Sequence, residues 1–416
     1  WDDGVLIAQT DEQEWADKGA FGEGFKYDWE GDCLTVSPAG VITALADGET
    51  TITVTPQSDA YGDLSAQITI VTANQGEGLI AKKVEIVNEK GVAFYQNLVR
   101  ELKAAGIEPM ITLFHSDMPM WVCDRGGWNN EETVDDFADF AELMVTSLPD
   151  VNWWFTMNEP QCFASDFVSV IAPGSDIKRV TRTILLAHRK LTIGYVIMGL
   201  AVEPVPGAVS EEEAYQMMTS DRGGSMGMAW WLDPMLLGEV QSALRDTISE
   251  EDLKRIHQPL DMFCANLYGS ANFHEVKGRK NPLAYPGMPK SLIKMPVRPA
   301  CIYWFAKMMY RRYGLPILYT ENGFSNIDFV MRDGKVHDPQ RIDYMANYLE
   351  WLKKAVAEGI SVIGYLYWSI MDNFEWMEGY DMRFGLIYID YRTQKRTLKD
   401  SAYYYRNVIA TNGEEL

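Results

Sequence analysis

From about residue 88 onward, the chain alternates between amphipathic helical segments and short, nearly continuous apolar segments. Strands that are apolar along their whole length are typical of a parallel sheet with helices packed on its faces. The alternation therefore predicts an α/β fold with six parallel strands. The six apolar segments span residues 107–114, 152–158, 191–200, 260–268, 316–322 and 361–370.

The segments between these strands have helical periodicity. Asn88 is positioned to cap a helix whose apolar residues recur at helical spacing from Val92 to Leu102 and which ends at Gly106. We expect the main helices that follow over residues 133–148, 177–190, 299–313 and 339–359.

Residues 1–74 have a different pattern. Short Thr-, Val- and Ile-rich runs alternate polar with apolar residues, and turn-forming stretches such as PAG and ADGE separate them. This pattern predicts a small antiparallel β module. The pattern over residues 36–55, within a similarity that covers about 40 residues, resembles the immunoglobulin-like repeats of bacterial surface and secreted proteins. The expected organisation is a β module over 1–74, a linker over 75–86 around the sequence NQGEG, and an α/β domain over 87–416.

Polar side chains gather where the predicted strands end. A single glutamate in such a place usually caps a helix or forms an ion pair at the rim. Five strands with the same feature instead predict an active site, because the carboxyl ends of parallel strands converge on one rim of a barrel. These residues are His115, Asn158, Glu159, Asn266, Tyr268, Glu321, Asn322 and Trp368.

Two of these residues, Glu159 and Glu321, are carboxylates on different strands. The sequence has no metal-ligand cluster and no Ser or Cys nucleophile motif, so we predict neither a metal nor a cofactor. A pair of carboxylates suits the hydrolysis of an acetal, in which one group gives a proton and the other attacks or activates water. Trp and Asn side chains nearby suit a sugar, which has an apolar ring face and many hydroxyl groups.

Four segments carry a more specific resemblance: TLFHSDMPMWV, TMNEP, LYTENGF and YWSIMDNFEWMEGYDMRFGLIY. With their order and their strand context, they are similar to glycoside hydrolase family 1, the β-glucosidase family. The similarity extends from about Val87 to Ile409. It implies a (β/α)8 TIM-barrel fold and hydrolysis of β-glycosides with retention by double displacement.

The resemblance also implies a role for each matching residue. Glu159 is the expected general acid/base and Glu321 the expected nucleophile. Tyr268 is expected to hydrogen-bond the nucleophile, and Asn158 to hold the 2-hydroxyl of the sugar. The remaining candidate substrate-binding residues are His115, Asn266, Trp368, Glu375 and Trp376.

Glu375 bears on the charge of the substrate. A carboxylate at this position would repel the dianion of a 6-phosphosugar. The Glu375–Trp376 pair therefore favours a neutral β-glucoside or β-galactoside, as a small molecule or at the end of an oligosaccharide.

The chain departs from the family where two βα units normally precede the segment at Val87. Those units supply a Gln for the sugar hydroxyls and an Arg beside the nucleophile, and we find no counterpart of them. The barrel is therefore expected to be incomplete, with about six βα units. Loss of the Arg would raise the pKa of the nucleophile. Ser116 and Met295 stand where the family has Trp.

Two alternatives remain open beside an active β-glycosidase. One is a catalytically impaired relative, fused to an immunoglobulin-like module, that acts as a carbohydrate-binding or surface protein. The other is a recombined or misassembled reading frame, with its junction near residues 74–87.

The composition of the chain limits the classes of partner that it could bind. The net charge of −22 argues against nucleic acid and against an anionic membrane surface, and no apolar run is long enough for a membrane span. The five cysteines form no C-x-x-C pair and are expected to be mostly buried thiols. His274 and His337 are expected to be surface or loop histidines. The sequence leaves the location of the protein open. It could be the cytoplasm or, if the immunoglobulin-like module is genuine, the cell surface or the outside of the cell. The sequence does not predict the oligomeric state.

Overall fold

The computed structural model describes residues 25–37, 42–46, 48–56, 64–73, 78–189, 194–258, 260–270, 275–276, 279–280 and 285–416. The chain divides into two compact units. The first consists of Trp1–Met110, Met118–Gly127 and Asp139–Asn152, and the second of Ile111–Asp117, Trp128–Ala138 and Trp153–Leu416. His274 lies outside the described residues.

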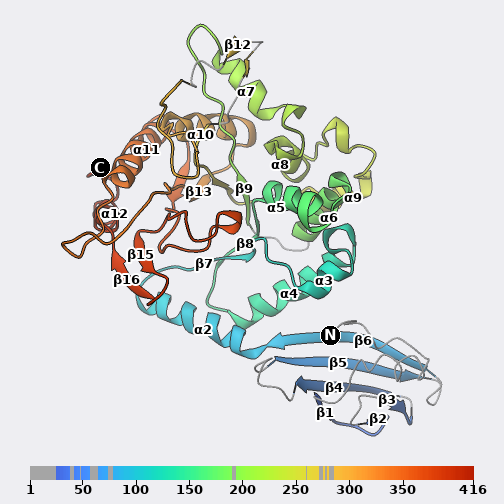
Figure 1. Ribbon diagram of the computed structural model, residues 1–416. Helices are drawn as coiled ribbons and strands as arrows, with labels where there is room; N and C mark the ends of the chain where they lie inside the picture. The colour runs from blue at the N-terminus through green and yellow to red at the C-terminus, as the bar shows by residue number, and fades with distance from the viewer. Residues whose placement is uncertain are drawn as a thin grey trace. The chain divides into compact units, whose positions relative to one another are not determined.

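The first unit contains a four-stranded antiparallel sheet in the order β1-β4-β5-β6 (Figure 1). Its strands are β1 (Phe25–Trp29), β4 (Gly48–Pro56), β5 (Leu64–Ala73) and β6 (Gly78–Asn88), and β2 (Leu34–Val36) pairs with β3 (Ile42–Ala44). Alternate residues of β4, Ile52 and Val54, are buried, as expected for a strand with one apolar face. The predicted antiparallel β structure is confirmed, whereas its immunoglobulin-like identity stays a prediction.

The structure differs from the predicted linker over residues 75–86. Residues 78–86 belong to β6, which pairs with β5 along its length. The glycines of NQGEG suggested a flexible connection, but Val84 and Ile86 recur with the period of a strand, and pairing with β5 satisfies the backbone. Helix α2 (Glu89–Ala104) follows directly and is capped by Asn88, whose side chain accepts a hydrogen bond from the Gly91 N–H at 2.9 Å.

The second unit is built on a six-stranded sheet in the order β14-β13-β10-β9-β8-β7. The bounds are β7 (Met110–Phe114), β8 (Trp153–Asn158), β9 (Gly194–Met198), β10 (Phe263–Asn266), β13 (Ile317–Glu321) and β14 (Val362–Tyr365). The pairs from β8 to β14 are parallel. The predicted six-stranded α/β sheet is therefore confirmed. Within the described part of the chain, β7 and β14 each have one strand neighbour.

Helices of the second unit lie around the outside of these strands (Figure 1). The four main helices expected after α2 are confirmed within two residues at each end, as α4, α6, α10 and α11. The helices after α2 are α3 (Met120–Asp124), α4 (Thr133–Ser147), α5 (Pro160–Asp166), α6 (Ile177–Arg189), α7 (Glu211–Thr219), α8 (Met228–Leu236), α9 (Glu250–Ile256), α10 (Ala300–Tyr313), α11 (Pro339–Ala357) and α12 (Asp400–Ala410). Two short antiparallel pairs complete the fold, β11 (Glu275–Val276) with β12 (Arg279–Lys280) and β15 (Ile387–Asp390) with β16 (Lys395–Leu398).

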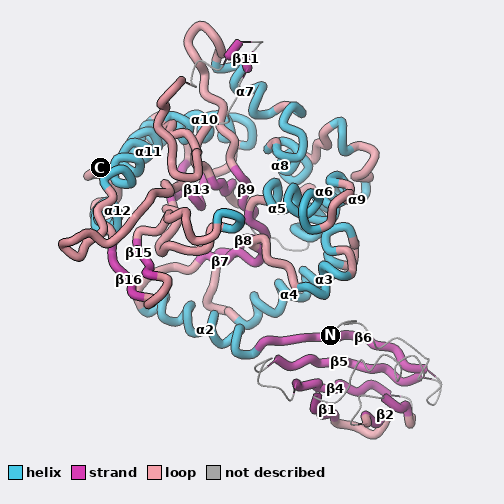
Figure 2. Tube along the Cα trace, viewed as in Figure 1, coloured by secondary structure: helices cyan, strands magenta, loops and turns pink. Residues whose placement is uncertain are grey.

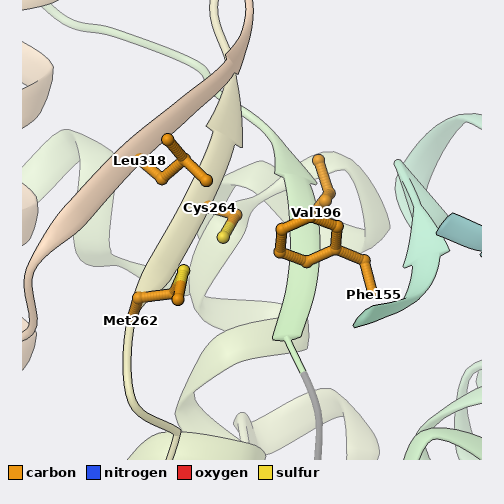
Figure 3. Close-up of a cluster of buried hydrophobic side chains, with 5 residues drawn as sticks. All are labelled: Phe155, Val196, Met262, Cys264 and Leu318. Carbon is orange, nitrogen blue, oxygen red and sulfur yellow. The ribbon is translucent and has the colours of Figure 1, made fainter. Parts of the chain in front are cut away.

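Five buried side chains form a cluster among the four central strands (Figure 3). Val196, Cys264 and Leu318 are direct partners across β9, β10 and β13, so their side chains share one face of the sheet. Phe155 and Met262 complete the cluster. This packing fixes the relative register of the strands whose ends carry the polar residues.

All five cysteines are free thiols, and Cys33, Cys264 and Cys301 are buried, as expected. No helix among the described residues has the length and apolar character that a bilayer crossing requires.

Candidate active site

The carboxyl ends of the central strands bring the predicted polar residues together. Asn158 ends β8, Asn266 ends β10 and Glu321 ends β13. The register pairs Asn266 directly with Glu321 on one side and with Met198 of β9 on the other. Residues far apart in the sequence are thereby placed at one edge of the sheet, as parallel topology requires.

Glu159 lies at the turn from β8 into α5. Its backbone adopts a left-handed conformation with φ of 45°, and its N–H donates to the Val196 carbonyl at 3.0 Å. Pro160 then begins α5, where its fixed φ suits the first helical turn. The side chain is held at both oxygens, because Oε1 accepts from Asn266 Nδ2 at 2.8 Å and Oε2 accepts from the Cys162 thiol at 3.1 Å.

Asn266 connects the two candidate carboxylates. Its Nδ2 also donates to Asn158 Oδ1 at 2.9 Å, and its Oδ1 accepts from Thr320 Oγ1 at 2.8 Å. The hydroxyl of Thr320 therefore fixes the orientation of the amide, with its NH₂ group toward Glu159. Beside it, Glu321 Oε2 accepts a hydrogen bond from the Tyr268 hydroxyl at 2.6 Å.

Burial dominates the electrostatics of this pair. It raises the pKa of Glu159, while the hydrogen bonds from Asn266 and Cys162 act in the opposite direction. Burial and the charge of Glu159 together raise the pKa of Glu321 to about 8. A hydrogen bond from the Tyr268 hydroxyl lowers it in part.

A second group of residues lies beside the edge strands. The His115 ring, which follows β7, stacks with Trp368 and Trp376 at centroid distances of 6.0 and 5.8 Å. Burial lowers the pKa of His115, which favours the neutral ring, and a neutral Nε2 can accept from Asn158 Nδ2 at 3.2 Å. Burial and the charge of Glu159 raise the pKa of Glu375 to about 7, and a hydrogen bond from Trp368 lowers it in part.

The structure therefore brings together all nine predicted site residues through direct contacts or hydrogen bonds. Sequence reasoning missed Cys162 and Thr320, which hold Glu159 and Asn266. The position of Cys162, three residues after Glu159 at a helix start, was the available signal. His337 lies outside this group, half-exposed between Asp333 and Asp400.

A buried charge network supports the segment that carries Glu375 and Trp376. This segment, between β14 and β15, is mostly loop (Figure 2). Asp372 accepts from Lys399 Nζ at 2.7 Å and from Arg383 Nη1 at 2.6 Å. Lys399 also donates to Asp328, so the loop is tied to the start of α12 and to the segment after β13. Each buried charge in this network contacts an opposite charge, and their attraction offsets part of the free-energy cost of removing the charges from water.

Among the described residues, no group of three or more His, Cys, Asp or Glu side chains has an arrangement that could hold a metal ion. The described side chains of the candidate site are paired carboxylates with amide, phenol and thiol donors around them.

Comparison with known proteins agrees with this geometry. Residues 81–414 match the model of Glycosyl hydrolase family 1. The chain is 34% identical to Beta-glucosidase A of Thermotoga maritima and 34% identical to 1,4-beta-D-glucan glucohydrolase of Thermotoga neapolitana, in each case over 79% of both chains. The solved structure of the Thermotoga maritima β-glucosidase with castanospermine is similar, with a TM-score of 0.70 and 31% identity over 79% of this chain and 80% of that one.

Proposed function

The chain belongs to glycosyl hydrolase family 1, and we propose that it hydrolyses terminal, non-phosphorylated β-glycosides with retention through Glu159 and Glu321. The observation that carries the proposal is the arrangement of these carboxylates at the ends of β8 and β13. Each is oriented by its own donor, Asn266 for Glu159 and Tyr268 for Glu321. The named relatives are β-glucosidases or glucohydrolases, and the first is solved with a sugar-like inhibitor.

In the first step, a Glu321 oxygen attacks the anomeric carbon while the bond from that carbon to the leaving oxygen breaks. Glu159 gives its proton to the leaving oxygen. In the second step, Glu159 takes a proton from water, whose oxygen attacks the same carbon and displaces Glu321. The raised pKa of Glu159 suits the first role, because the group must be protonated when the bond breaks.

The burial that raises the pKa of Glu159 also raises that of Glu321, which limits the ionised fraction of the proposed nucleophile. With a pKa of about 8, Glu321 is mostly protonated at neutral pH and attacks only from its ionised fraction. We therefore expect kcat/KM to fall as pH drops below about 8.

Substrate binding is proposed for the residues around the pair. Asn158 would hold the 2-hydroxyl group of the sugar, and Trp368 and Trp376 would contact the apolar ring face. His115, Asn266 and Glu375 would bind the other hydroxyls. Glu375 favours a neutral sugar, because its carboxylate repels a phosphate dianion.

We also propose that residues 87–416 form a family 1 domain of six βα units, without counterparts of the first two units of the family barrel. The six strands of the described sheet support this division. An immunoglobulin-like identity for residues 1–74 is supported by their resemblance to such repeats and by the antiparallel pairing of β1, β4 and β5.

A second candidate function is carbohydrate binding without turnover. It is favoured by the raised pKa of Glu321 and by the two edge strands of the parallel sheet. In that case, the edge aromatics would still bind a sugar while the nucleophile stayed protonated.

Hydrolysis of aryl β-glucosides and β-galactosides by the purified chain, measured from pH 6 to 9, separates the two candidates. An active enzyme should release phenol faster toward pH 8, and Glu159→Gln should lower kcat by about 10²–10⁴-fold for poor leaving groups. A 2-fluoro glycoside should label Glu321, and we expect the two carboxyl groups to lie about 5 Å apart. Sugar binding by folded protein without labelling or turnover would favour the binding function.

A further inference from the structure

We propose that the Cys162 thiol is a positioning residue for Glu159, which it holds by donating a hydrogen bond to Oε2. This inference rests on the proposed role of Glu159 as the acid/base. The thiol adds a second donor to the one from Asn266, so both oxygens of the carboxylate are held by protein groups.

The first turn of α5 places the thiol. The Cys162 N–H donates to the Glu159 carbonyl at 2.9 Å, which closes a tight turn over Pro160 and Gln161. Residues three apart in such a turn lie on the same side, so the Cys162 side chain returns over that of Glu159.

The turn is also fixed to the neighbouring strand. Gln161 Nε2 donates to the Met198 carbonyl at 3.1 Å, and the Met198 N–H donates to Gln161 Oε1 at 3.3 Å. Gln161 is 1% exposed, so this pair of hydrogen bonds is shielded from water. The thiol is thereby positioned by backbone that is attached to β9.

A second acceptor competes for the thiol proton. Met198 Sδ lies 3.4 Å from Cys162 Sγ, but a thioether is a weak acceptor and a carboxylate is a strong one. The proton is therefore directed to Glu159 whenever that group is ionised. When Glu159 is protonated, the thiol can turn toward Met198, so it favours the ionised state.

Among the described residues, the titratable side chains that interact most strongly with Glu159 or Cys162 are Glu321, Glu375, Tyr268 and Asp166, none of which is a cation. His115 approaches through Asn158 in its neutral form. Burial and the neighbouring carboxylates raise the pKa of the Cys162 thiol, which keeps it protonated. It therefore acts as a donor and not as a nucleophile.

This arrangement has a consequence for the reaction. Glu159 must be protonated to expel the leaving group and ionised to activate water. A donor that favours the ionised form should assist the second step. Its removal should raise the pKa of Glu159 and slow the hydrolysis of the glycosyl-enzyme relative to its formation.

The test compares Cys162→Ala, Cys162→Ser and Cys264→Ala. The last variant is the matched control, since it removes a buried thiol that points into the apolar cluster of Figure 3. The pKa of Glu159 is measured in folded protein by ¹³C NMR of labelled glutamate, with Glu159→Gln to assign the signal. The basic limb of kcat/KM is measured for a substrate with a poor leaving group.

In Cys162→Ala we expect both the NMR pKa and the basic limb to rise by about 0.5–1 pH unit. Cys162→Ser should return them to or below the parent values, because a hydroxyl is a stronger donor, and Cys264→Ala should leave them unchanged. If the parent hydrolyses the substrate and Cys162→Ala shifts neither the NMR pKa of Glu159 nor the basic limb, the role proposed for the thiol is wrong. The proposed function would then still stand. Absence of turnover in the folded parent would overturn the proposed function, and with it the role assigned to the thiol.

Discussion

The centre and the edges of the parallel sheet differ in how much they are buried. In the central strands β8, β9, β10 and β13, most side chains are buried, and every residue of β10 is at most 2% exposed. In the edge strands, Met110 of β7 is 37% exposed and Ile363 of β14 is 51% exposed. A strand gains its full apolar burial only when both of its neighbours and the helices above it are in place. Stability is therefore expected to be concentrated in the centre.

The candidate site shows the same division. Glu159, Asn266 and Glu321 lie at the carboxyl ends of central strands and are connected by hydrogen bonds of 2.6–2.9 Å with Asn158, Tyr268 and Thr320. The residues at the edges contact one another mainly by ring stacking, and Trp376 is 44% exposed. The proposed catalytic pair is thus placed at the well-packed part of the sheet, and most of the proposed sugar-binding aromatics lie at the exposed part.

The largest effect should come from the core of the centre. Leu318→Ala removes a buried side chain from the cluster with Phe155 and Cys264, and we expect it to lower the free energy of unfolding by about 2–5 kcal/mol. Ile363→Ala, on the neighbouring strand β14, should cost less than about 1 kcal/mol, because the side chain is half-exposed. Urea unfolding of both variants measures the difference, and equal losses would break the contrast between centre and edge.

The next effect concerns turnover. Asn266→Ala removes the donor to Glu159 and the acceptor for Thr320, and we expect kcat to fall by about 10²-fold. KM should rise by a smaller factor, because Asn266 is also a proposed ligand of the sugar hydroxyls. Trp376→Ala should instead raise KM by about tenfold and change kcat less, since it removes a proposed sugar-binding surface. Steady-state kinetics at pH 8 compares the two, and a mainly KM effect of Asn266→Ala would mean that Asn266 acts in sugar binding and not in positioning Glu159.

The centre was also the part of the fold that the sequence predicted best. Each central strand lies in a continuous apolar run, and β8, β10 and β13 end in a polar residue, so their positions and the candidate site residues could be predicted from local pattern. The prediction of a linker was wrong over residues 78–86. This segment has only a weak local preference for one secondary structure, and pairing with β5 makes it a strand.

Other features depended on tertiary geometry that no local pattern contains. Thr320 and Cys162 were missed because their role lies in the direction of one hydrogen bond each. The Asp328–Lys399–Asp372 network was missed for a related reason, since its members come from three separate segments of the chain.

The effect most specific to the buried carboxylates is a dependence of stability on pH. The pKa of Glu321 rises from an ordinary value of 4.5 to about 8 on folding, so between these values the folded protein binds more protons than the unfolded chain. Stability therefore decreases as pH rises, by up to about 1.4 kcal/mol per pH unit. Glu321→Gln has no such proton to lose. The free energy of unfolding of this variant minus that of the parent should therefore increase from pH 5 to pH 8 and then stay constant.

Glu375→Gln is the matched comparison at the edge. The pKa of Glu375 rises only to about 7 and its side chain is half-buried. The difference in free energy of unfolding between this variant and the parent should therefore be smaller and should stop increasing near pH 7. Urea unfolding at pH 5, 6, 7, 8 and 9 gives both curves. If the curves of Glu321→Gln and the parent ran parallel, the folded protein would not raise the pKa of Glu321, the proposed nucleophile, and the expected loss of kcat/KM below pH 8 would lose its physical basis.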